Sequence, residues 1–495
     1  MKKHKIIWLT MVLFFISLNA GFAQTQTPTT LEQKKDQTDT IKLPSKWKLS
    51  GSIRSRYEWW DWFNPGNIPS GRDNNYPFLG NLVKIKATNE RKYTDTNLEF
   101  AIPSLFFLPK NSIAPPPFGQ LGLGANYRAV NRGNFTSIFL KQANLNFKGI
   151  VEKNTNVRLG RFEFADGLEY VTGDPTLDWL RKNRISQRLI GNFGFTHVQR
   201  SFDGFQVARD DKRSNITIVG ARPTQGVFDL QGWGDLRNVN FLYTALSPKF
   251  QSKNSDARLF HLLYKDNRAV LKSDNRPLSL LSKDARDILI NSFGGHFIQK
   301  FGPLDFLSWG TLQFGDWGKL RHKAFAYDLE LGYKPKSVEM KPYFRIGRTR
   351  SSGDSNPTNG EHETFFQFLP TPRQYARFPF FNMMNLKDHF AQFLFNPRDK
   401  MTISLGYHNL RLAEPKDLWY LGGGAFQNTS FGYVGRPSNG KRTLANFLDI
   451  GVDYKVSKNL DFSFYFGHAI GEGVIRSIYP GRRGNFTYWE LTRYF

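Results

Sequence analysis

The feature that most constrains this chain is an alternation of apolar and polar residues with a period of two. Between Trp47 and Trp60 the odd positions are mostly apolar, whereas the even positions up to Glu58 are polar or charged. This period predicts β-strands with one apolar and one polar face. The pattern recurs at residues 83–88, 143–147, 343–346, 403–407, 448–454 and 462–466. The chain is therefore predicted to be all-β.

Composition distinguishes between the two all-β architectures that alternate in this way. A soluble sandwich also gives alternating strands, so the period alone does not decide. Aromatic residues make up 15% of the chain, yet its mean hydropathy is −0.47. A transmembrane barrel explains both values, because aromatic girdles lie on its apolar outside and its interior is polar. We therefore expect a transmembrane antiparallel β-barrel.

Chain length sets the expected size of this barrel. Membrane strands need about 9–11 residues each, which gives roughly 16–18 strands once turns and loops are allowed for. A barrel of that size is wide enough to leave an aqueous channel. Two Pro- and Gly-rich stretches, Ile102–Val130 and Ser351–Leu386, are predicted to be loops that cover the pore or fold into it.

The N-terminus predicts export. Three lysines precede an apolar run from Ile6 to Leu18, and small residues follow at Gly21 and Ala23. This is the pattern of a secretory signal peptide, expected over residues 1–23. Residues 24–46 are polar and lack periodicity, which predicts a flexible periplasmic leader. The barrel is expected over residues 47–495, and the absence of cysteine excludes disulfides.

The chain carries a formal charge of +26, so an anionic partner is expected. Nucleic acid would also suit this charge, but the signal peptide and the interleaving of cations with apolar residues argue against it. Arginine suits acidic sugars, because its planar group binds carboxylates in bidentate fashion and stays charged. Alternation predicts these cations on the lumen face: Arg54, Arg56, Lys84, Lys86 and Arg345.

Four stretches carry a resemblance to a known family: Ser351–Asn385, Asp417–Phe426, Leu159–Glu163 and Arg188–Gly204. They are similar to the alginate-export family of outer-membrane porins. The resemblance implies a single-chain barrel in the cell outer membrane, and it favours eighteen strands. It also implies an arginine-rich constriction that passes an acidic polyuronate out of the cell. Three further pore-lining candidates lie in the matching motifs: Arg161, Arg373 and Arg377.

Each candidate also has a structural interpretation. Lumen arginines can brace the wall by pairing with acids such as Glu58, Glu90 or Glu99. Arg161 follows Gly160, which is consistent with a packing or turn role. Arg377 lies among aromatic residues and can make cation–π contacts with them.

The sequence shows no catalytic, metal or cofactor motif. His389, His408 and His468 are isolated, and the acids of residues 354–362 lack the spacing of a calcium loop. Gly422–Gly424 lacks the lysine of a phosphate loop, so a strand kink or a close contact is expected there. Neither catalytic residues nor cofactors are predicted.

We expect a channel for an anionic polysaccharide such as a polyuronate. The alternative is an anion-selective porin for uptake of small acidic solutes or oligosaccharides. A barrel enzyme would need a nucleophile and a base at the rim, and no motif signals one. Expected partners are outer-membrane lipid, the barrel-assembly machinery through the terminal Phe495, and a periplasmic export protein docking on the leader. The protein is expected to be a monomer.

Overall fold

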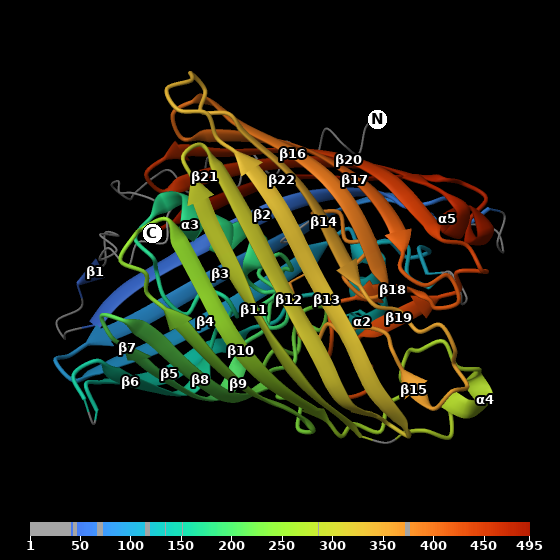
Figure 1. Cartoon of the computed structure of the whole chain (residues 1–495), viewed down its shortest axis with the longest axis horizontal. Helices are drawn as coiled ribbons and strands as arrows, with labels where there is room; N and C mark the ends of the chain where they lie inside the picture. Colours follow the sequence, from blue (N-terminus) through green and yellow to red (C-terminus); the bar gives the residue numbers. More distant parts are fainter. Residues whose placement is uncertain are drawn as a thin grey trace.

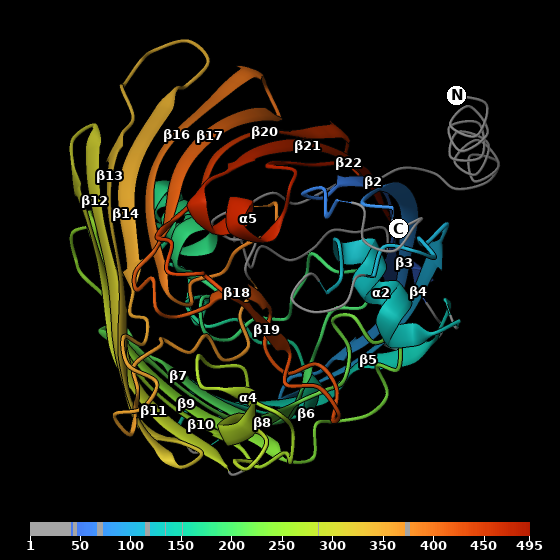
Figure 2. The ribbon, with the colours of Figure 1, turned by 90° about the vertical axis from the view of Figure 1, so that its right-hand side faces the viewer.

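The structure, a computed structural model, is a closed β-barrel (Figures 1 and 2). It describes residues 41–42, 47–66, 73–113, 119–133, 135–150, 152–285, 287–371 and 377–495. Eighteen antiparallel strands form the barrel, which confirms the predicted fold class. These strands are β2 (Trp47–Asp61), β3 (Asn75–Glu90), β4 (Thr94–Phe106), β5 (Phe139–Lys148), β6 (Thr155–Phe162), β7 (Phe202–Asp210), β8 (Ser214–Pro223), β9 (Val239–Pro248), β10 (Ser255–Asp266), β11 (Ile288–Phe301), β12 (Leu304–Trp317), β13 (Leu320–Tyr333), β14 (Tyr343–Ser351), β16 (Leu386–Arg398), β17 (Met401–Leu412), β20 (Thr443–Ser457), β21 (Leu460–Gly471) and β22 (Arg483–Tyr494).

The remaining elements are short and lie in the connections or at the N-terminal side. They are β1 (Ile41–Lys42), α2 (Leu123–Asn131), α3 (Pro175–Leu180), the π-helical turn η1 (Arg181–Ile185), α4 (Leu278–Leu281), β15 (Glu361–His362), β18 (Trp419–Gly422), β19 (Tyr433–Arg436) and α5 (Gly473–Ile478). None of the helices in these described ranges is long and apolar enough to cross a membrane.

The first and last barrel strands pair with each other and close the sheet. Strand β2 pairs with β3 on one side and with β22 on the other. The terminal Phe495 extends this closure, because it exchanges backbone hydrogen bonds of 2.8 and 3.1 Å with Gly51. The predicted signal peptide lies outside the described residues. So does the predicted leader, except for β1, which pairs with the start of β2.

Short turns and long connections alternate around the barrel. Gly302-Pro303 is a two-residue turn between β11 and β12, and Gly302 adopts a φ of 62° that favours glycine. The connections at the opposite end are mostly longer, the longest spanning residues 163–201 and 352–385. Outer-membrane barrels carry short turns on the periplasmic side and long loops outside, so the long connections define the extracellular end.

Both faces of the wall carry apolar residues, but for different reasons. The outer face of β14 carries Phe344 and Ile346, whose exposed fractions of 47% and 59% suit contact with lipid. On the inner face, Trp309 and Phe260 are buried against chain that lies inside the barrel. The sequence predicted a polar interior, whereas two apolar clusters occupy much of the lumen. The predicted loop Ile102–Val130 begins later than expected, because β4 continues to Phe106.

Candidate pore interior

Extracellular connections fold into the lumen and contact one another there (Figure 2). The connection 163–201, between β6 and β7, pairs with the connection 352–385 through a bridge between Ile190 and Leu369. Backbone hydrogen bonds of 2.8 Å join Gly191 N to Leu369 O and Leu369 N to Leu189 O. The predicted loop Ser351–Leu386 therefore folds inward. The other connection, residues 163–201, is called the inner segment below. The inner segment narrows the lumen.

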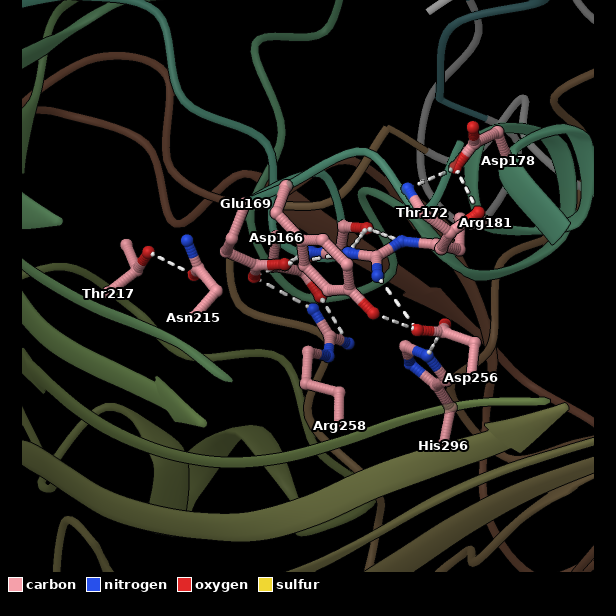
Figure 3. Close-up of polar contacts among 12 residues, drawn as sticks. Asp166, Glu169, Thr172, Asp178, Arg181, Asn215, Thr217, Asp256, Arg258 and His296 are labelled. Carbon is pink, nitrogen blue, oxygen red and sulfur yellow. Dashed lines mark hydrogen bonds and ion pairs between the residues drawn. The ribbon is translucent and has the colours of Figure 1, made fainter. Parts of the chain in front are cut away.

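Buried ion pairs tie the inner segment to strand β10 (Figure 3). The Arg181 guanidinium lies 3.1 Å from Asp256 and 3.4 Å from Glu169. Arg258 of β10 lies 2.9 Å from Glu169, and the Tyr170 hydroxyl donates to Asp256. Burial alone would raise the pKa of Glu169, but Arg258 and Arg181 outweigh it and hold that pKa at about 2. Glu169 is therefore ionised and binds both arginines.

A second set of ion pairs ties the same segment to strand β13. Arg184 Nη2 lies 2.8 Å from Glu330, and Arg188 Nη2 lies 2.6 Å from Asp328. Glu330 also accepts from Arg345 of β14 at 2.6 Å, and Arg345 lies 2.6 Å from Asp305. Arg188 also lies 3.8 Å from Glu330, so three arginines surround this carboxylate: two from the inner segment and one from the wall.

Arginine side chains of strand β2 bind backbone carbonyls near the C-terminal end of the inner segment. Arg54 donates to the carbonyls of Gly194 and Thr196 at 2.8 and 2.6 Å, and Arg56 donates to that of Phe195 at 2.5 Å. Nearby, burial and the charge of Arg56 lower the pKa of His197 to about 3, so its ring is neutral. The guanidinium groups of β2 therefore position this stretch of chain.

The predicted pore-lining residues lie in several separate places. Arg54 and Arg56 face the lumen on β2, where Glu490 lies 3.6 and 3.3 Å from them. Lys84 and Lys86 alternate with the outward-facing Ile85 on β3, and Lys84 lies 3.8 Å from Glu99.

The family-motif candidates and Arg345 have other surroundings. Arg345 is only 1% exposed within its ion pairs, so it braces the wall. Arg161 shares a strand face with the outward Leu159 and binds Asp203 through two 2.7 Å hydrogen bonds. Arg377 lies 2.6 Å from Asp453. Arg373 lies outside the described residues.

Sequence reasoning missed the arginines of the inner segment. Arg181, Arg184 and Arg188 recur at spacings of three and four, a pattern that predicts one side of a helix. In the structure the helical turn η1 ends at Ile185, so Arg188 lies beyond it. This spacing indicates a basic helical face, but it does not indicate which acidic residues of the barrel strands form ion pairs with these arginines.

A cavity of about 380 Å³ lies at the extracellular side of the lumen. We call it the aromatic cavity. It lies between α2, residues 193–196 of the inner segment, and the β18–β19 hairpin. Arg132 and Arg436 contribute to its lining, which contains no acidic side chain, and Arg436 Cζ lies 5.4 Å from the Trp62 ring centroid. Its aromatic lining residues are Trp60, Trp62, Phe193, Phe195, Phe228, Phe381 and Phe426.

The glycine run beside this cavity makes close contacts, which is one of the two possibilities that the sequence left open. A Cβ on Gly423 would lie 2.0 Å from the Phe193 ring, and one on Gly424 would lie 2.0 Å from the Phe368 carbonyl. Among the described residues, no group of three or more His, Asp or Glu side chains is arranged to hold a metal ion.

Fold and interior together define the class of this protein: an outer-membrane β-barrel channel narrowed by its own inward connections. The model of one family, described as "Alginate export", matches residues 125–476. The chain therefore belongs to the alginate export family, as the resemblance indicated, and is located in the outer membrane.

Solved structures agree with this fold at low sequence identity. Acinetobacter baumannii OccAB2 is 9% identical with a TM-score of 0.57, over 91% of this chain and 98% of that one. OccAB1 of the same organism is 10% identical with a TM-score of 0.53, over 93% and 99%. The outer membrane protein opdK from Pseudomonas aeruginosa is 8% identical with a TM-score of 0.50, over 90% and 98%. No curated protein sequence matches the chain.

Proposed function

We propose that this protein is a channel for an anionic polysaccharide of the polyuronate type. The observation that carries the proposal is the aromatic cavity, whose lining combines two arginines and several aromatic rings with no acid. Aromatic faces pack against the C–H faces of sugar rings, and arginine binds carboxylates in bidentate fashion. A chain of uronate units presents both groups in alternation. Family membership supports the same substrate class.

One feature favours the alternative, an anion-selective porin for small acidic solutes or oligosaccharides. A cavity of about 380 Å³ has the size of a small-ligand site. Buried acids also neutralise most inner-segment arginines, so the lumen offers few free cations for a long polymer. Under this alternative, the same cavity binds one or a few acidic sugars during uptake.

Single-channel recording in a planar bilayer tests both functions. We expect anion selectivity, and block by polyuronate but not by neutral dextran of the same length. Block should weaken in Arg132→Gln and Arg436→Gln, which remove the cations of the aromatic cavity. Arg476→Gln is the matched control, because it removes an exposed cation from α5 outside the cavity.

The outcomes separate the two candidates. Block by short uronates alone would favour the porin for small solutes. A pore indifferent to every uronate would contradict both. Recognition of Phe495 by the assembly machinery, a periplasmic partner on the leader, and a monomeric state remain predictions.

A further inference from the structure

Three cations form a row across the outer wall of the barrel. Arg350 of β14 is directly opposite Lys387 of β16, which is directly opposite Arg411 of β17. Facing residues in such ladders have Cβ atoms about 4.5–5.5 Å apart, and like charges there destabilise the pairing. Arg348 lies on the same face, one dyad closer to the membrane. We call Arg348, Arg350, Lys387 and Arg411 the outer basic patch.

The outer basic patch faces lipid, not the lumen. Arg348 and Arg350 share their strand face with Phe344 and Ile346, which belong to the apolar outer band. All four cations lie at the extracellular ends of their strands, just beyond this band. This is the depth at which the headgroups of the outer leaflet meet the barrel.

These cations lack the acidic partners that arginines have inside the barrel. None of the four forms an ion pair with any described residue; Arg411 donates to Asn409 at 3.0 Å, and Arg350 Cζ lies 5.6 Å from the Phe325 ring centroid. The charges that act on Lys387 are mainly those of Arg350, Arg442 and Arg348, and the opposing charge of Glu414 acts more weakly. The patch therefore retains excess positive charge that an external anion can neutralise.

A groove of about 370 Å³ adjoins the row of cations. Its lining indicates a second property of the bound anion. Leu312, Phe314 and Phe325 supply its apolar lining, and Lys323 and Arg350 supply its cations. Glu363 and Glu414 are its acids. Apolar side chains of the outer wall thus lie beside basic ones. This arrangement suits a ligand in which an acyl chain adjoins a phosphate group.

We propose that the outer basic patch binds the phosphate groups of a phosphorylated, multiply acylated glycolipid of the outer leaflet, of the lipid A class. Arginine forms bidentate charge-assisted hydrogen bonds with phosphate, and basic surface clusters recognise anionic lipid headgroups. The adjoining groove accommodates part of one acyl chain. The proposal depends on the location in the outer membrane and not on the solute that the channel passes.

Native mass spectrometry of the full-length protein in detergent tests this site. The probes are bisphosphorylated lipid A, the same lipid without its phosphates, inorganic phosphate and polyuronate. The test variant combines Arg350→Gln, Lys387→Gln and Arg411→Gln. The control combines Lys153→Gln, Lys336→Gln and Lys341→Gln, which removes three exposed cations from the periplasmic turns.

We expect the test variant to bind bisphosphorylated lipid A about 100-fold more weakly than the control does, if each cation contributes the usual surface attraction. Its melting temperature without lipid should equal or exceed that of the control, because repulsion within the row is removed. Channel conductance should not change, so this test is independent of the proposed function. Equal binding by both variants, equal binding of dephosphorylated lipid, or preference for polyuronate or free phosphate would overturn the proposal.

Discussion

Glu330→Gln is the sharpest test of how the inner segment is held. Glu330 is buried and is the only carboxylate within ion-pair distance of Arg184 among the described residues. Its other partners, Arg345 and Arg188, keep Asp305 and Asp328, each at 2.6 Å, when Glu330 is neutralised. The substitution preserves side-chain shape, so it removes charge without creating a cavity.

The expected loss in unfolding free energy is about 3–5 kcal/mol, the cost of leaving one buried charge without its partner. Only one pair is counted, because Asp305 still compensates Arg345 and Asp328 still compensates Arg188. The double variant Arg184→Gln with Glu330→Gln also removes the unpaired positive charge of Arg184. The double variant should recover part of the loss, with a coupling energy of about 1–3 kcal/mol.

Guanidinium unfolding in lipid vesicles, followed by tryptophan fluorescence, measures these energies for the four proteins of the cycle. Single-channel conductance reports the other consequence: releasing Arg184 should loosen the inner segment and enlarge or destabilise the open current level. A stability change below about 0.5 kcal/mol with additive single variants would refute the assigned coupling. Unchanged conductance in a destabilised variant would show that the inner segment does not limit the pore.

Two further predictions concern acid and close contacts. Because the folded pKa of Glu169 is about 2, below its usual 4.5, its stabilisation is present above about pH 4.5 and is lost as the pH falls toward 2. Glu169→Gln should lack this acid-dependent part of the unfolding free energy, and equal pH profiles would contradict the prediction. Gly440→Ala should cost about 1 kcal/mol through its positive φ alone. Gly424→Ala should lower the melting temperature further, since its Cβ would clash with the Phe368 carbonyl; equal losses would argue against that contact.

The local pattern was sufficient to predict the barrel. A period of two fixes which face of a strand each residue occupies, and this predicted the lumen-facing positions of Arg54, Arg56 and Lys84. The length of the chain, divided by the length of a membrane strand with its turn and loop, gave the approximate strand number, and the family motifs favoured eighteen. These inferences succeeded because strand periodicity depends on neighbours in sequence.

The role of each cation depends on contacts between residues far apart in the sequence. Arg184 meets Glu330 across 146 positions of sequence, and Arg54 meets the carbonyl of Gly194 across 140. Such pairings depend on how far a long connection folds into the lumen, which strand periodicity does not encode. Arg161 was predicted to line the pore because it lies in a family motif. In the structure it lies on the outward face of its strand and binds Asp203. Local sequence patterns are enough to specify a basic, aromatic-rich barrel. The folding of the long connections sets which charges are paired inside and which face the membrane, because ion-pair partners come from distant parts of the chain.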